Sequence, residues 1–384
     1  MATSALSPRV SHAWAVAAVA ALALGCGGED ASPTDATTSS TSAAGSTGGG
    51  GSGAAGGAGA AGGEAPSAGG GGGGALPIDA PPDEWAWRPI EGTRCGNGST
   101  AGVAVNLHEG SSDYFIVVSG GGACWDDTMC NVDNASIHLH EDLTESLVTP
   151  ELPGVDRSDP NNPLSTASWV YVPYCTGDIH WGDRTADYAS GTIEHRGASN
   201  MRTFLQRLQA TRPASKRVLL LGGSAGGYGV TLHIATANEV FGDVEVHALA
   251  DASPLVMPQG DRWATMQAAW APALPPGCTC CQDDPGFILD TLATAYPDSR
   301  HGLLTYDDDA VISAYFGFSG NLPAAVEALR TTHHDPFPNT KYFIGPGTDH
   351  GVLDDAVTAP DGTTPTAFMV GWLVGDPACH SVAF

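Results

Sequence analysis

Residues 217–228 read RVLLLGGSAGGY, and this stretch decides the expected fold. Residues 218–221 have the length and composition of a buried strand, and residues 228–240 carry apolar side chains along one side, as a helix does. Between them lies the pattern G-x-S-x-G, whose glycines permit a sharp turn. A strand, a tight turn and a helix in this order predict that Ser224 is a nucleophile held above the end of a sheet.

Other short apolar runs predict further buried strands at residues 114–118, 169–172, 246–250 and 341–344. Apolar residues at positions 201, 204, 205 and 208 fall on one helical face, and that helix should end near Pro213. Strands that alternate with helices predict a doubly wound, mostly parallel sheet flanked by helices, which is an α/β-hydrolase fold.

The chain of 384 residues divides into three expected parts. Residues 1–26 read as a lipoprotein-type signal peptide whose Cys26 would be lipidated after cleavage. Residues 27–80 are mostly Gly, Ala, Ser and Thr, a composition typical of a disordered linker. Residues 81–384 form the catalytic domain, so we expect an exported protein that is lipid-anchored at the bacterial outer membrane or cell surface, or otherwise secreted.

The formal net charge is -27, from 42 acidic and 15 basic residues. Such a charge disfavours nucleic acid as a partner, since phosphates need a basic surface. It also disfavours anionic substrates.

Eight cysteines lie beyond Cys26, and an even number in an exported chain predicts up to four disulfides. The candidates are Cys95, Cys124, Cys130, Cys175, Cys278, Cys280, Cys281 and Cys379. Among them we expect the local pair Cys124 and Cys130. Residues 278–281 could instead bind zinc, although their spacing is not that of a structural zinc site.

A serine nucleophile needs a histidine as base and a carboxylate that orients it, in the chain order Ser, acid, His. His350 is the expected base because it follows the strand at 341–344 in a Gly-rich loop, whereas His333 and His334 resemble a solvated loop pair. The acid candidates are Asp251 and the run Asp307, Asp308 and Asp309, which could also be an exposed loop or a calcium site.

Backbone N–H groups must also stabilise the oxyanion. Ala225 follows the nucleophile directly, and the glycines at 120–122 end an earlier strand, as the oxyanion turn of esterases does.

These motifs resemble the pectin acetylesterase and Notum-type carboxylesterase family over residues 120–384. The family's Gly-Gly-Gly-Trp-Cys turn is similar to residues 120–124, its Cys-Ser-Ala-Gly-Gly elbow to residues 223–227, and its Asp-Ala-Gly to residues 251–253. The family's Tyr-Asp pair resembles Tyr306 and Asp307. The resemblance therefore implies Asp307 as the acid, and it supports Gly121, Gly122 and Ala225 as oxyanion donors.

The chain departs from the family at three positions, where Gly223 and Gly351 replace cysteines and Ala123 replaces a tryptophan. We therefore expect a different disulfide network. The resemblance implies the family's reaction chemistry more strongly than it implies the family's substrate.

The expected function is a serine carboxylesterase that needs no metal or cofactor and removes short acyl groups, such as acetyl, from a polysaccharide or similar ester. One alternative is a lipase or polyester depolymerase that acts on longer chains. Another is an inactive surface protein that binds ligands through its tryptophans at 85, 87, 125 and 181. The sequence does not specify an oligomeric state.

Overall fold

The structure is a computed structural model that describes residues 75–130, 135–138, 157, 162–353 and 355–384. The signal peptide, Cys26 and nearly all of the linker expected from the sequence lie outside the described residues.

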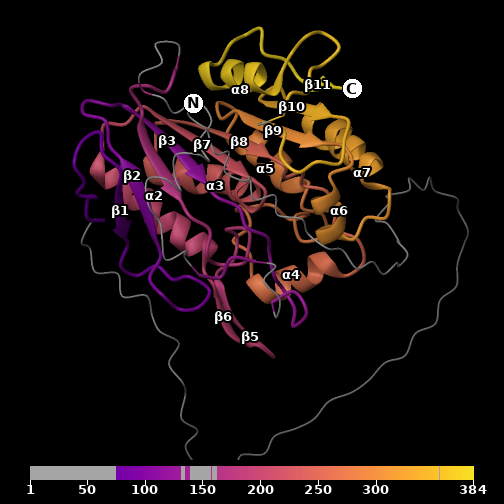
Figure 1. Cartoon of the computed structure of the whole chain (residues 1–384), viewed down its shortest axis with the longest axis horizontal. Helices are drawn as coiled ribbons and strands as arrows, with labels where there is room; N and C mark the ends of the chain where they lie inside the picture. The colour runs from indigo at the N-terminus through magenta and orange to yellow at the C-terminus, as the bar shows by residue number, and fades with distance from the viewer. Residues whose placement is uncertain (1–74, 131–134, 139–156, 158–161, 354) are drawn as a thin grey trace, which may run out of the picture. The chain divides into compact units, whose positions relative to one another are not determined.

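A mixed but mostly parallel sheet organises the described part of the chain (Figure 1). Its order is β1-β2-β4-β3-β7-β8-β9-β10-β11. Only the β1–β2 and β2–β4 pairings in this sheet are antiparallel. The strands are β1 (Ala86–Pro89), β2 (Gly102–Asn106), β3 (Asp113–Val118), β4 (Ser168–Val172), β7 (Arg217–Gly223), β8 (Glu245–Asp251), β9 (His301–Tyr306), β10 (Thr340–Gly345) and β11 (Val382–Ala383).

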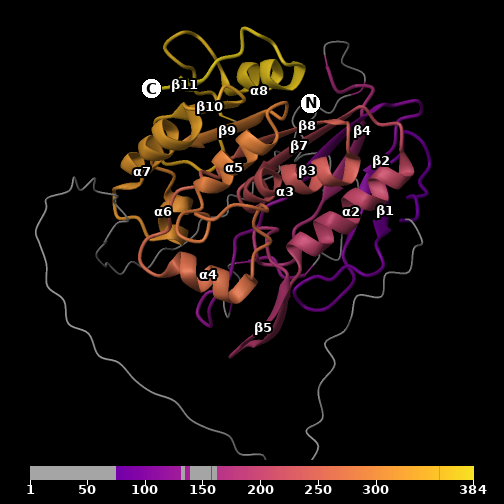
Figure 2. The ribbon, with the colours of Figure 1, turned by 180° about the vertical axis from the view of Figure 1, so that it is seen from behind.

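Helices cover both faces of this sheet, as the fold prediction requires. Figure 2 shows α2, α3 and α5 across one face, while α8 packs with the apolar cluster of the other. The helices are α2 (Gly197–Thr211), α3 (Ala225–Phe241), α4 (Arg262–Trp270), α5 (Phe287–Ala295), α6 (Ala310–Phe316), α7 (Leu322–Leu329), the π-helix η2 (Arg330–His334) and α8 (Pro365–Val374). A hairpin of β5 (Arg184–Tyr188) and β6 (Gly191–His195) lies beside α4. The α/β-hydrolase fold is confirmed.

Alternation along the strands produces two apolar cores. On β7, Val218 and Leu220 belong to the larger cluster beneath α2 and α3, whereas Leu219 and Leu221 belong to the cluster beneath α8. Successive side chains of a strand point to opposite faces, so a strand that is apolar throughout must be covered on both sides.

Three disulfides join Cys95 to Cys175, Cys124 to Cys130, and Cys278 to Cys281. The expected pair of Cys124 and Cys130 is confirmed. The possible fourth bridge is absent among the described cysteines, because Cys280 and Cys379 are unpaired.

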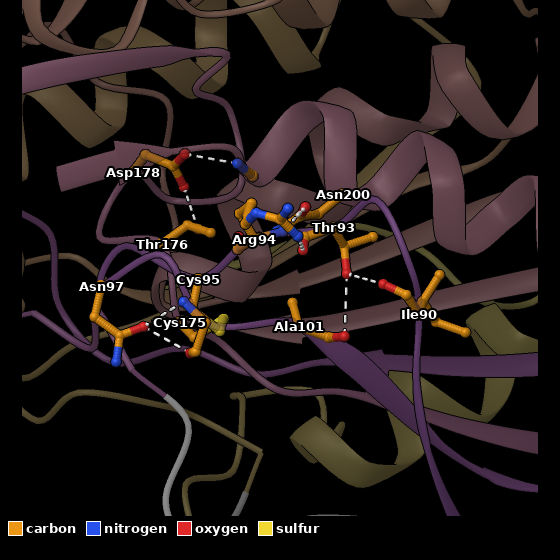
Figure 3. Close-up of a disulfide and its surroundings, with 12 residues drawn as sticks. Ile90, Thr93, Arg94, Cys95, Asn97, Ala101, Cys175, Thr176, Asp178 and Asn200 are labelled. Carbon is orange, nitrogen blue, oxygen red and sulfur yellow. Dashed lines mark hydrogen bonds between the residues drawn. A yellow bond between two sulfur atoms is a disulfide. The ribbon is translucent and has the colours of Figure 1, made fainter.

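The disulfide of Cys95 anchors a buried turn that contains Asp178 (Figure 3). Asn200 of α2 holds the other side of this region, because its amide accepts from Arg94 N at 3.0 Å and donates to Arg94 O at 2.6 Å. Asp178 itself accepts from Thr176 Oγ1 at 2.6 Å and from Gly197 N, at the start of α2, at 2.8 Å. The turn after β4 is thereby tied to both the amino-terminal segment and α2.

Six of the buried histidines make acid lability an expected property of this fold. Burial lowers the pKa to about 4 for His180, His195 and His233, and to about 3 for His247, His301 and His334. In the unfolded chain the same groups titrate near 6.5, so that state binds more protons below this pH and stability falls. Asp178 acts in the opposite direction, since burial raises its pKa to about 6, but it is one group against six.

We therefore predict that the free energy of unfolding is nearly constant from pH 8 to 7 and falls steadily between pH 6.5 and 4. Each unit of pKa displacement contributes about 1.4 kcal/mol per group. Urea unfolding at constant ionic strength measures this dependence. A free energy of unfolding that is unchanged between pH 7 and 5 would contradict it.

Candidate active site

Ser224 occupies a strained elbow between β7 and α3. Its φ of 54° and ψ of -126° lie in a region that residues other than glycine rarely adopt. Such strain at a partly exposed serine is typical of a nucleophile elbow. The helix begins at Ala225, so its first N–H groups and positive dipole end lie beside the serine.

Glycines permit the elbow because backbone segments approach too closely for side chains. A Cβ on Gly226 would lie 1.9 Å from the carbonyl oxygen of Val118 on β3, and one on Gly222 would lie 2.2 Å from the oxygen of Gly226. Gly227 faces Ser253 in the same way, with 1.9 Å to its Oγ. By contrast, a Cβ on Gly223 would meet nothing within 4 Å.

His350 pairs with a carboxylate, and that carboxylate belongs to Asp309. The distance from His350 Nδ1 to Asp309 Oδ2 is 2.8 Å. Asp309 is fully buried, while the His350 side chain is 24% exposed. Because a carboxylate only accepts, Nδ1 carries the hydrogen, and Nε2 keeps the lone pair that a general base needs.

The other oxygen of Asp309 caps helix α6. Asp309 Oδ1 accepts from Val311 N at 2.9 Å and from Ile312 N at 3.0 Å. These two hydrogen bonds fix the carboxylate plane, and so they fix the direction from which Oδ2 meets the imidazole.

The structure differs here from the sequence expectation of Asp307. Asp307 Oδ1 accepts instead from the backbone N–H of Gly347, at 3.0 Å. The physical reason is that the chain turns into α6 directly after Asp309, so the third carboxylate of the run faces the His350 loop. Both Asp307 and Asp308 hydrogen-bond to Gly347, so they have a structural role in this loop.

Four adjacent strands bring these residues to one edge of the sheet. Ser224 follows β7, Asp251 ends β8, Asp309 follows β9 and His350 follows β10, and these strands are parallel neighbours. Ligands of open α/β sheets bind beyond the carboxyl ends of the strands, which is where this group lies.

The glycine turn after β3 packs directly against the elbow. A Cβ on Gly120 would lie 2.6 Å from Gly223 O and 3.2 Å from Ala225 N. Gly121 and Gly122 follow with φ of 152° and 73°, values that favour glycine. His180 supports the turn, since its Nε2 lies 2.9 Å from Ser119 O. The sequence analysis did not identify His180 and Asp178. Their only signal in the sequence was a short run of polar residues between apolar ones.

The tryptophans that a binding protein would expose are partly or fully buried. Trp125 and Trp181 are 5% and 1% exposed, and Trp85 and Trp87 are half-buried against the second core cluster. Trp125 packs edge to face against Trp270, whose Nε1 donates to Cys124 O at 2.7 Å. Trp125 and Trp181 thus belong to the core rather than to an exposed binding surface.

The competing histidines have structural roles. His333 and His334 are each 5% exposed, so the expectation of a solvated pair is wrong, and His333 Nδ1 contacts Asp290 Oδ1 at 2.8 Å. His334 lines a cavity of about 20 Å³ together with His301, Thr231 and Ser253. That volume suits about one water molecule and is too small for an ester.

Within the described ranges, no cluster of three or more His, Cys, Asp or Glu side chains could hold a metal ion. No helix in the described ranges is long and apolar enough to cross a membrane.

Comparison with known proteins identifies a family of esterases. Residues 88–263 match the family model described as pectinacetylesterase. The family resemblance is confirmed. The pectinacetylesterase match includes the glycine turn, the Ser224 elbow and Asp251, but it ends before Asp309 and His350, so the pairing of these two residues rests on the structure alone.

Curated relatives are palmitoleoyl-protein carboxylesterases of the Notum type. The chain is 26% identical to notum2 of Xenopus laevis over 165 residues, which are 41% of this chain and 34% of that protein. It is 26% identical to NOTUM of Mus musculus over 166 residues, 41% of this chain and 33% of the relative. For NOTUM of Drosophila melanogaster the values are 29% over 150 residues, 36% and 22%. The match thus spans about a third or less of these relatives.

The elbow makes a direct prediction about stability. Gly226→Ala should lower the free energy of unfolding by at least about 2 kcal/mol, or prevent folding, because the new methyl group would collide with the β3 backbone. Gly223→Ala is the matched control in the same turn and should stay within about 0.5 kcal/mol of the wild type. Urea unfolding measures both, and equal losses in the two variants would contradict the packing described.

Proposed function

We propose that this protein is a serine carboxylesterase in which Ser224, His350 and Asp309 form the catalytic triad. The observation that carries the proposal is the 2.8 Å contact between His350 and the buried Asp309, at the same sheet edge as the strained Ser224. Asp309 takes the role that the family resemblance assigned to Asp307.

In the proposed reaction, Ser224 Oγ attacks the ester carbonyl while His350 Nε2 accepts its proton. Asp309 stabilises the resulting imidazolium and holds its orientation. Backbone N–H groups of Ala225, Gly121 and Gly122 donate to the oxyanion. The tetrahedral intermediate then collapses, the alcohol leaves with the proton from His350, and an acyl-serine remains. Water attacks this acyl group with His350 again as base, which releases the acid and restores the serine.

Short acyl groups on a polysaccharide or a similar ester are the proposed substrates. The description of the matching family model supports acetyl esters. The name of the relatives instead supports a longer, palmitoleoyl chain. A lipase-like or polyester-cleaving activity is therefore the second candidate.

We further propose that the protein is exported and anchored through lipidated Cys26, with residues 27–80 as a linker and residues 81–384 as the enzyme domain. Three disulfides support export, since such bonds persist in oxidising compartments.

Substitution of the triad should remove most of the activity on p-nitrophenyl acetate. Ser224→Ala and His350→Ala should lower kcat by about 10⁴-fold or more, and Asp309→Asn by about 10²- to 10⁴-fold, because the imidazole loses its orienting partner. Asp307→Asn is the matched control, since asparagine keeps an acceptor for Gly347 N, and its kcat should stay near that of the wild type.

A loss at Asp307 with full activity at Asp309 would restore the family-based assignment. Hydrolysis that survives in Ser224→Ala would refute the nucleophile. If the folded wild type hydrolyses no ester, the protein is an inactive member of the fold. A series of p-nitrophenyl esters from acetate to palmitate decides between the two substrate candidates by the chain length with the highest kcat/KM.

A further inference from the structure

Asp251 is the carboxylate at this edge that the proposed reaction does not use. It is the last residue of β8, it is 7% exposed, and it pairs in register with Gly223 on β7, directly before the nucleophile. Its backbone oxygen accepts from Ser224 N at 2.9 Å and from Ser253 Oγ at 2.7 Å. The main chain of Asp251 therefore contacts the elbow itself.

The side chain of Asp251 reaches across to the His350 loop. Val352 N lies 2.9 Å from Oδ1 and 3.1 Å from Oδ2, and Leu353 N lies 3.3 Å from Oδ2. Val352 is fully buried in the second core cluster. Two backbone N–H groups just beyond the histidine are thus bound to a residue 101 and 102 positions earlier in the chain.

These contacts give Asp251 a role different from that of Asp309. His350 Nδ1 is already bound to Asp309, and the Asp251 oxygens accept from backbone N–H groups. The carboxylate instead joins the loop that carries the base to the strand beside the nucleophile.

We infer that Asp251 is a positioning residue that sets the distance between Ser224 and His350 by binding the backbone of the His350 loop. This inference rests on the proposed function. Hydrogen bonds from N–H groups to a carboxylate are stronger than neutral ones, and a buried N–H group that loses its partner is destabilising. A residue at the end of a rigid strand therefore restricts the motion of the loop that carries the base. This matters because small displacements of a catalytic group slow a reaction severely.

The test compares Asp251→Ala with Asp251→Asn in the full chain. Asp251→Ala should lower kcat for p-nitrophenyl acetate by about 10- to 100-fold with KM little changed, since the loop moves while the substrate site remains. Asp251→Asn keeps one oxygen acceptor for Val352 N and should recover part of this loss. The pKa values seen in the pH profile of kcat/KM should not change, because the pair of His350 and Asp309 is intact.

Hydrogen exchange gives a second readout that does not need activity. The amides of Val352 and Leu353 should exchange faster in Asp251→Ala than in the wild type, as measured by mass spectrometry on native protein. Asp113→Ala is the control: it removes an ion pair with Arg217 at the opposite end of β3 and β7, and so it lowers stability without touching the site. Its kcat and its exchange at residues 352 and 353 should equal those of the wild type.

An active wild type whose kcat is unchanged in Asp251→Ala would overturn the inference and leave the proposed function standing. Unchanged exchange at Val352 and Leu353 would also overturn it. If the wild type is inactive, the proposed function fails, and the exchange rates still decide whether Asp251 holds the loop. Should Asp251→Ala not fold, Asp251→Asn carries the same test with a smaller expected change.

Discussion

The contact between the backbone of β3 and the first turn of α3 is the constraint on which the site depends. The backbone at Gly226 packs so closely against Val118 that no side chain would fit between them. The chain leaves β7 and enters α3 within one residue. Ser224 is that residue, and its strained φ is the consequence. The energy of this strain is offset by the packing of two apolar cores around the sheet, since a local conformation of this kind persists only when its surroundings determine it.

Beyond the elbow, each neighbouring strand contributes one part of the site from its carboxyl end. β8 supplies Asp251, which contacts both the elbow and the loop after β10. The loop after β9 supplies Asp309, which caps α6 with one oxygen and holds His350 with the other. Each carboxylate thus joins a rigid element to a loop, and this arrangement gives loop residues the fixed geometry that catalysis needs.

The main strands and the elbow were predictable from the sequence because they depend on local patterns. Buried runs such as residues 218–221 are apolar throughout, and the glycines around Ser224 have a stereochemical requirement. Strand β9 was not predicted because its sequence HGLLTY contains only two consecutive aliphatic residues. The pairing of Cys124 with Cys130 was predictable from proximity, whereas that of Cys95 with Cys175 depends on how distant segments pack.

The identity of the proposed acid could not be predicted from the sequence. Three consecutive aspartates are equivalent by composition, and the residue at which α6 begins decides which of them faces His350. The same limit applies to His333 and His334, which are polar in sequence but buried because η2 packs against α5 and β10. The role of Asp251 as a backbone acceptor likewise became visible only once the His350 loop was placed beside β8.

The central claim is that Ser224 is an activated nucleophile, and covalent labelling tests it most directly. Native protein would be treated with a fluorophosphonate and the modified residue mapped by mass spectrometry. We predict modification at Ser224 in the wild type and its loss in His350→Ala. A folded, disulfide-bonded sample that remains unlabelled, or one that is labelled at another residue, would contradict the account.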